Sequence, residues 1–415
     1  MRIAVEAHAL SQEKITGVGK VILHYLDALQ KIDRENEYFI YTMDDIRHIA
    51  ISSPLWRYVD FNYLLKRVRM RIRARWLRLR DGAAPGPLPG ARLLFYRLAK
   101  IILESIDEIV FSLKLASSLK KNDIDVYIGT STYYYPYFFF SPVKKAGIIY
   151  DLVWELFPET MELGNRIRMK LFTLRYMKKL DLMISISENT KKDAREILGL
   201  TNRIDAIPLA ADREIFFRAP AASIASCKNK YGITKKYILS VCTLEPRKNL
   251  RALIEAYRML PSRHAYQLVL VGMTGWLQSG FFKDLESSDV NNNVIFTGYV
   301  SNDDLAPLYS GADLFVFPTL YEGFGLPVLE AMQCGCPVIT SNNSSIPEVA
   351  GDSAVMIDPH NIDSLAEAME KLLINNASKR ELSKKGLRRA KQFSWDTSAK
   401  MLLSSLRSIT HDRAE

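Results

Sequence analysis

Two carboxylates flank a glycine-containing loop within residues 320–352. Glu322 and Glu330 are eight positions apart, and Pro327 stands where a helix would begin, a position that proline favours. Free backbone amides at such a helix N-terminus would suit a phosphate; here they belong to Phe324, Gly325 and Leu326, next to Gly323. The two glutamates would then reach hydroxyl groups at opposite ends of a diphosphate-containing ligand, a hexose and a ribose. A surface helix cap with two solvated glutamates is the alternative from spacing alone.

A basic pair lies in the run TLEPRKNL (residues 243–250), directly after an apolar run that predicts a strand. Arg247 and Lys248 would therefore stand at the carboxyl end of a strand, where parallel sheets bind ligands. Two cations there would neutralise a diphosphate leaving group, and a guanidinium can bind it bidentately. The alternative for such a pair is a solvated loop, with Asn249 starting the next helix.

A third motif, TGVGK (residues 16–20), follows the first predicted strand. Gly17 and Gly19 would let the backbone approach a phosphate or a sugar. The motif is not GxGxxG and lies about ten residues beyond the strand, which argues against a dinucleotide site.

Basic charge is concentrated in one segment, residues 66–80, KRVRMRIRARWLRLR. It supplies eight of the ten excess positive charges of the 415-residue chain and contains no acid. A pI of about 9.2 alone would suggest nucleic-acid binding, but this distribution argues against a nucleic-acid partner. If this segment is a helix, its apolar residues form a stripe surrounded by arginines, a pattern typical of helices that bind an anionic membrane surface. The residues that we assign to membrane contact are Arg67, Arg71, Arg75, Trp76 and Arg78. The alternatives are a strand, a solvated helix, or an arm that meets a partner protein.

Strand-like and helix-like runs alternate along most of the chain. Strands are expected at residues 3–7, 37–43, 126–130, 146–151, 182–187, 237–243, 266–272, 293–298, 313–318, 337–341 and 354–359. Helices are expected at 21–32, 91–120, 188–198 with Ser187 as its N-cap, 249–260, 301–312, 325–335, 362–376 and 378–393. This alternation predicts an α/β protein with parallel sheets and right-handed crossovers.

The periodicity lapses over residues 212–233, which divides the chain into two doubly wound, Rossmann-like domains facing across a cleft. The expected domains are 1–211, with a basic insertion at about 62–92, and 212–395. Residues 396–415 are expected to form a helix that packs back on the N-terminal domain.

The sequence shows no n-region, h-region and cleavage site of a signal peptide, and no run of about 18 apolar residues. Its four cysteines fit neither a zinc pattern nor a secreted disulfide framework; they are Cys227, Cys242, Cys334 and Cys336. We therefore expect a cytoplasmic protein whose membrane contact is peripheral, on the inner face of the cytoplasmic membrane.

Taken together, these motifs resemble those of the retaining glycosyltransferases of family 4 (glycosyl transferases group 1), which have the GT-B fold. EGFGLPVLE is similar to the family's E-x7-E signature, which implies that Glu322 contacts the donor hexose and Glu330 the nucleotide ribose. The same resemblance implies diphosphate contacts from the loop amides and from Arg247 and Lys248. It further implies base contacts from Tyr299 and Val300, within TGYV, and a role for the glycines of TGVGK at the donor phosphate and acceptor. The N-terminal domain would bind the acceptor and the C-terminal domain the nucleotide sugar.

The chain departs from the family pattern at two places near the expected cleft. Many relatives have His-Asp where this chain has Tyr150-Asp151. Tyr150 has no ring nitrogen, so it cannot act as that histidine would. We assign Asp151 to the acceptor or sugar side. His8 stands where relatives often have arginine, and we expect it to be structural. Arg247 would take over for another arginine that relatives carry near Cys242 and Thr243.

The resemblance implies transfer with retention at the anomeric carbon and no metal or other cofactor. Asp123-Ile124-Asp125 has the letters of a metal-binding DxD motif but precedes its strand, so we do not expect a metal there. The motifs are most similar to those of bacterial polysaccharide mannosyltransferases, as in O-antigen synthesis. They predict a GDP-mannose donor and a lipid-linked or oligosaccharide acceptor. The alternatives are a UDP-hexose- or GDP-rhamnose-dependent transferase and an epimerase of similar shape.

Overall fold

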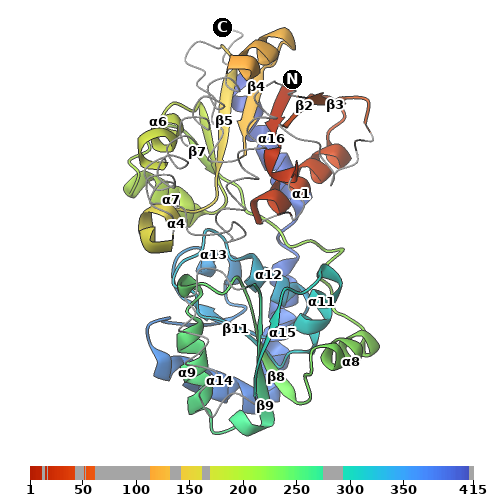
Figure 1. Cartoon of the computed structure of the whole chain (residues 1–415), viewed down its shortest axis with the longest axis vertical. Coiled ribbons are helices and arrows are strands. Elements are labelled where there is room, and N and C mark those ends of the chain that lie inside the picture. The colour runs from red at the N-terminus through yellow and green to blue at the C-terminus, as the bar shows by residue number, and fades with distance from the viewer. Residues whose placement is uncertain are drawn as a thin grey trace, which may run out of the picture.

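The computed structural model describes residues 1–11, 15, 17–42, 51, 53–60, 113–130, 142–160, 169–273 and 293–410. Figure 1 shows two sheet-containing units, one above the other, each covered by helices. The basic segment, the insertion expected at 62–92 and the five arginine and tryptophan residues assigned to the membrane lie outside the described residues.

The N-terminal sheet has seven strands among the described residues, in the order β3-β2-β1-β4-β5-β6-β7, and neighbouring strands pair in parallel. The strands are β1 (Arg2–Glu6), β2 (Glu37–Thr42), β3 (Trp56–Asp60), β4 (Val126–Gly129), β5 (Lys144–Ile149), β6 (Leu182–Ser185) and β7 (Ile204–Ala206). The central strands are apolar and buried on both faces, as parallel sheets between helices require.

The C-terminal sheet has six strands in the order β10-β9-β8-β11-β12-β13, also in parallel pairs. The strands are β8 (Lys236–Val241), β9 (Tyr266–Val271), β10 (Val294–Gly298), β11 (Leu314–Phe317), β12 (Val338–Ser341) and β13 (Val355–Ile357). Strand order reverses between β8 and β11. The segment after β8 carries the predicted cations, and the segment after β11 carries Glu322 and, on the next helix, Glu330.

Helices cover the sheets and connect the strands. In the N-terminal unit they are α1 (Gly17–Ile32), α4 (Val153–Leu156), α6 (Leu174–Met177) and α7 (Glu188–Glu196), with the short helices η1 (His8–Ser11), η2 (Pro158–Thr160) and η3 (Met169–Thr173). In the C-terminal unit they are α8 (Ala221–Lys230), α9 (Leu250–Met259), α11 (Asn302–Gly311), α12 (Leu326–Gln333), α13 (Ile346–Ala350), α14 (Ile362–Ile374) and α15 (Asn376–Ala390), with η4 (Pro246–Lys248) and η5 (Arg263–Ala265). None of the described helices is both long and apolar enough to cross a bilayer.

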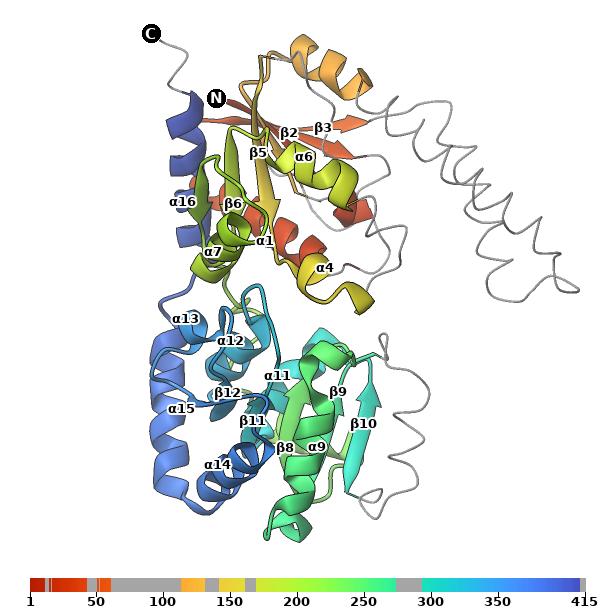
Figure 2. The same cartoon turned by 90° about the vertical axis from the view of Figure 1, so that its left-hand side faces the viewer.

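The last helix, α16 (Trp395–Thr410), returns to the N-terminal unit, where it contacts α1, β5 and β6 (Figure 2). The Ser398 hydroxyl donates a hydrogen bond to the carbonyl of Pro208, and Arg407 lies 3.2 Å from Glu35. The chain therefore crosses between the units twice, before α8 and before α16.

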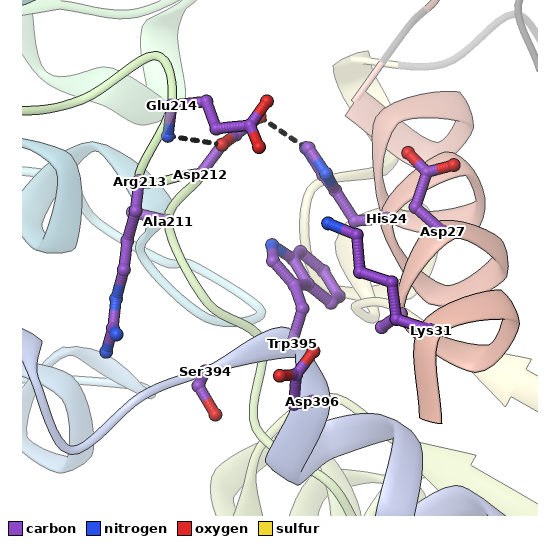
Figure 3. Close-up of a pocket in the computed structure, with 11 residues that line it drawn as sticks. His24, Asp27, Lys31, Ala211, Asp212, Arg213, Glu214, Ser394, Trp395 and Asp396 are labelled. Carbon is purple, nitrogen blue, oxygen red and sulfur yellow. Dashed lines mark hydrogen bonds and ion pairs between the residues drawn. The ribbon is translucent and has the colours of Figure 1, made fainter. Parts of the chain in front are cut away.

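The two crossings meet beside α1 around a small cavity (Figure 3). His24 stacks on Trp395 with 4.9 Å between ring centroids, and its Nε2 atom lies 3.9 Å from Asp212. The cavity measures about 190 Å³, below the roughly 300 Å³ at which ligand pockets begin. The cavity lies where the chain crosses between the two units, and none of the predicted site residues lines it.

Most expected elements are present, and Ser187 accepts a hydrogen bond from the amide of Thr190 as the predicted N-cap. Residues 17–20 were expected in a loop before the helix, but they form the first turn of α1. The prediction was wrong because glycine has a low helix propensity, so this glycine-containing segment was assigned to a loop. The sequence did not predict β3, β7 or α8. The two strands are short and lie at the sheet edges, and α8 buries only Cys227, so it has no apolar stripe.

Candidate functional site

Residues 322–326, here called the glycine loop, form the last part of the connection from β11 to α12 and include the first residue of α12. Gly325 is the N-cap of α12 with φ of +111°, a conformation that side chains rarely adopt. The buried Ser345 hydroxyl lies 2.8 Å from the carbonyls of both Glu322 and Phe324 and fixes their direction. Within the described part of the chain, the amides of Phe324, Gly325 and Leu326 donate no hydrogen bond. The loop therefore presents free donors at the start of a helix, the arrangement that favours an anion.

The predicted cations lie beside this loop and share one carboxylate. Lys248 Nζ lies 2.5 Å, and Arg247 Nη1 3.2 Å, from the same Oε1 atom of Glu322. Burial alone would raise the pKa of Glu322, but Lys248 and Arg247 lower it below its usual value. Glu322 is thus an anion held between two cations in a largely dehydrated position.

Glu245 is a further charged member of this cluster that the sequence analysis did not single out. Its Oε1 atom lies 2.5 Å from Arg247 Nη2 and 4.0 Å from Lys248 Nζ. The only signal in the sequence was its place two residues before Arg247 in LEPRK. The Nε–H group of Arg247 is buried and has no acceptor among the described residues. One buried donor of a tightly held guanidinium is therefore unsatisfied by the described residues, which is unusual in a folded protein and is expected where a ligand supplies the acceptor.

Asp151 joins the cluster from the N-terminal unit, at the carboxyl end of β5. A Cβ atom on Gly323 would lie 1.9 Å from the Tyr150 carbonyl and 3.0 Å from the Asp151 Cβ, so the two units touch here and only glycine fits. Burial raises the pKa of Asp151, while a hydrogen bond from the amide of Val153 and the charge of Arg247 lower it. The structure thus brings Asp151 together with the three predicted residues of the other unit.

His8 and Tyr150, the two departures from the family pattern, follow β1 and β5 at the carboxyl end of the N-terminal sheet. The Tyr150 hydroxyl donates a hydrogen bond to the carbonyl of Thr130 at 3.0 Å. The amide of His8 donates to the buried carboxylate of Glu6, which also accepts from the hydroxyl of Thr130. Glu6 therefore fixes the backbone at the start of η1.

Glu330 lies on α12 and faces different neighbours from Glu322. Its carboxylate accepts a hydrogen bond from the Tyr309 hydroxyl at 3.0 Å. Burial raises the pKa of Glu330 to about 7, against the opposing effects of Tyr309 and Lys20. Lys20, in the first turn of α1, also lies 3.5 Å from Asn302 of α11. The turn that contains Gly17 and Gly19 therefore approaches the C-terminal unit at the Glu330 end.

The other predicted donor contacts, Tyr299 and Val300, follow β10. Tyr299 is 66% exposed and Val300 is buried. Among the described residues, no group of three acidic, histidine or cysteine side chains could hold a metal ion. The roles assigned to all of these residues stay predictions.

The C-terminal part of the chain matches a known family. Residues 225–389 match the model described as Glycosyl transferases group 1. The chain is 37% identical over 221 residues to O-antigen chain mannosyltransferase B of Escherichia coli, covering 52% of this chain and 57% of that protein. It is 36% identical over 286 residues to serotype-specific mannosyltransferase WbdA of Escherichia coli, covering 66% of this chain and 34% of that protein. The chain thus spans about half of the first relative and a third of the second.

Solved structures share the architecture over almost the whole chain. Sucrose-phosphate synthase from Thermosynechococcus elongatus superposes with a TM-score of 0.71 at 18% identity, covering 99% of each chain. Anabaena HepE in complex with UDP-glucose superposes with a TM-score of 0.67 at 15% identity, covering 98% of this chain and 100% of that one. The expected fold of two Rossmann-like domains, the GT-B fold, is confirmed.

Proposed function

Residues 225–389 form a glycosyl transferases group 1 domain, and from this premise we propose that the chain is a retaining hexosyltransferase that transfers mannose from GDP-mannose. The observation that carries the proposal is a set of unused donors next to Glu322, the carboxylate that pairs with both cations. These are the glycine-loop amides and the buried Nε–H of Arg247. Donors held in advance in a dehydrated site suit an anionic leaving group.

The expected chemistry is loss of the nucleoside diphosphate from the sugar with attack by an acceptor hydroxyl on the same face. The new bond joins the anomeric carbon to the acceptor oxygen, and the departing phosphate oxygen takes the acceptor's proton. Arg247, Lys248 and the α12 N-terminus would stabilise the diphosphate. Asp151 would orient the sugar or acceptor from the opposite unit. Because these groups supply the positive charge, we propose that no metal ion is needed.

Mannose as the transferred sugar rests on the relatives, since both of the proteins compared above are named as mannosyltransferases. HepE was solved with UDP-glucose, so a UDP-hexose remains the alternative donor, with GDP-rhamnose as a further one. The acceptor would be a lipid-linked or oligosaccharide chain in cell-surface polysaccharide synthesis. The basic segment supports a cytoplasmic enzyme bound peripherally to the inner face of the cytoplasmic membrane.

The test is to incubate the full chain separately with GDP-mannose, GDP-rhamnose and UDP-glucose, with and without a synthetic lipid-linked saccharide, in EDTA and in Mn²⁺. We expect GDP release and an α-mannosyl product in both conditions, with anomeric configuration read by NMR. A changed sugar without nucleotide release would indicate an epimerase. Absence of release and transfer with all donors would overturn the proposal, and activity only with Mn²⁺ would overturn its metal independence.

A further inference from the structure

The first turn of α7, in the N-terminal unit, docks against the glycine loop of the C-terminal unit. The fully buried Thr190 hydroxyl donates a hydrogen bond to the carbonyl of Gly323 at 3.1 Å. It accepts one from the Ser187 hydroxyl at 3.0 Å. A helix N-cap and a loop of the predicted donor site are therefore joined through one threonine.

A second contact places a carboxylate of the C-terminal unit on the end of the same helix. Glu348, on α13, accepts hydrogen bonds from the backbone amides of Glu188 at 2.8 Å and Asn189 at 2.6 Å. These amides belong to the first turn of α7, whose N–H groups have no partner within the helix. A carboxylate there also interacts favourably with the helix dipole. Glu348 therefore completes the cap of a helix that belongs to the other unit.

A third contact lies one turn further along α7. The Tyr321 hydroxyl, one residue before the glycine loop, donates to the carboxylate of Asp193 at 2.9 Å. Each of the three contacts joins α7 to the C-terminal unit, two of them at or next to the glycine loop and one at α13. Figure 2 shows α7 above α13 and α12, at the junction of the units.

We infer that Glu348 is a positioning residue that, with Thr190, holds the glycine loop in its anion-binding geometry by docking it on α7. The site would then be complete only while the two units are in contact at α7. The carboxylate of Glu348 bonds to the amides of α7, so it would act on the loop through α7 and Thr190. The kinetic consequence rests on the proposed function, but the docking itself does not.

Docking is tested by hydrogen exchange on the full chain, read at peptides covering 186–196 and 320–330. In Glu348→Ala, two capped amides of α7 lose their acceptor, so exchange in the 186–196 peptide should accelerate roughly tenfold. If the loop is docked on α7, the hydrogen-bonded amides of the 320–330 peptide, such as Glu322, should exchange faster as well. Glu348→Gln keeps an oxygen acceptor and should lie between this variant and the wild type. Thr190→Val, which removes the hydroxyl at similar volume, should accelerate exchange in the loop peptide. Glu367→Ala, an exposed position on α14, is the matched control.

Kinetics give the second readout. The KM for the sugar nucleotide should rise roughly tenfold in Glu348→Ala and recover partly in Glu348→Gln. Wild-type exchange in both peptides of a folded Glu348→Ala protein would overturn the inference, whatever its activity. Accelerated exchange in a chain that uses no sugar nucleotide would support the docking and contradict only the proposed function.

Discussion

Lys248 Nζ lies 2.5 Å from the Glu322 carboxylate oxygen that also pairs with Arg247. One oxygen of Glu322 thus pairs with both of the cations that are predicted to bind the diphosphate. A diphosphate that enters this site meets cations already balanced by Glu322 and Glu245, so its binding would redistribute existing ion pairs. This arrangement holds the cations in place before the ligand arrives, which lowers the cost of organising them during the reaction.

Replacing Lys248 with alanine is expected to lower kcat by about 10²–10³-fold, because a fixed cation at the developing diphosphate charge is lost. The measurement is donor turnover, with circular dichroism to show that the variant is folded. Lys236→Ala is the matched control, since Lys236 is exposed at the other end of β8. Wild-type turnover in a folded Lys248→Ala protein would contradict the assignment of this lysine.

Replacing Glu245 with glutamine tests whether this carboxylate fixes Arg247. The variant loses a charged partner 2.5 Å from Nη2, so we expect kcat/KM to fall roughly tenfold while the protein stays folded. Adding Arg247→Ala to Glu245→Gln should cost no more than Arg247→Ala alone, because the two act through one guanidinium. Full additivity in this double-mutant cycle would show that Glu245 acts independently of Arg247.

The raised pKa of Glu330, about 7, predicts a pH-dependent effect on stability. In the unfolded chain a glutamate has a pKa of about 4.3. Between pH 4.3 and pH 7, roughly, Glu330 has therefore lost its proton in the unfolded chain but keeps it in the folded one. The wild type therefore loses stability as pH rises through this range, by up to about 1.4 kcal/mol per pH unit. Glu330→Gln lacks this titration, and its stability relative to the wild type should improve from pH 4.5 to 7 and then level off.

The measurement is urea unfolding of both proteins at pH 5, 6, 7 and 8, with Glu367→Gln as the exposed control. If the difference in free energy of unfolding between Glu330→Gln and wild type does not change with pH, burial does not raise the pKa of Glu330.

Deleting residues 66–80 tests the predicted membrane contact. With about 1 kcal/mol for each basic residue near an anionic surface, the deletion should abolish co-sedimentation with anionic vesicles. Wild-type binding should weaken as salt rises, and neutral vesicles should bind poorly. Equal binding with and without the segment, or binding insensitive to salt, would contradict this role.

Much of the fold could be predicted because parallel strands buried on both faces are continuous apolar runs, such as residues 182–185. The elements that escaped prediction lack such a signal. The edge strand β7 has three residues, and α8 buries one side chain. The first turn of α1 was not predicted because glycine has low helix propensity, whereas in the structure Gly19 is buried in the helix beside Ile15 and Ala9.

For the candidate site, the sequence by itself determined which groups are local to one another. Glu322 with its loop, and Arg247 with Lys248, are neighbours along the chain, so their spacing already predicted an anion site, whereas Glu245 was not singled out. Only the tertiary structure decided which groups from distant segments meet: Asp151 against Gly323, and Glu348 on the amides of α7. The physical reason is that these contacts join two different sheets. A capping carboxylate 160 residues from the amide it binds leaves no periodicity or spacing in the sequence to reveal it.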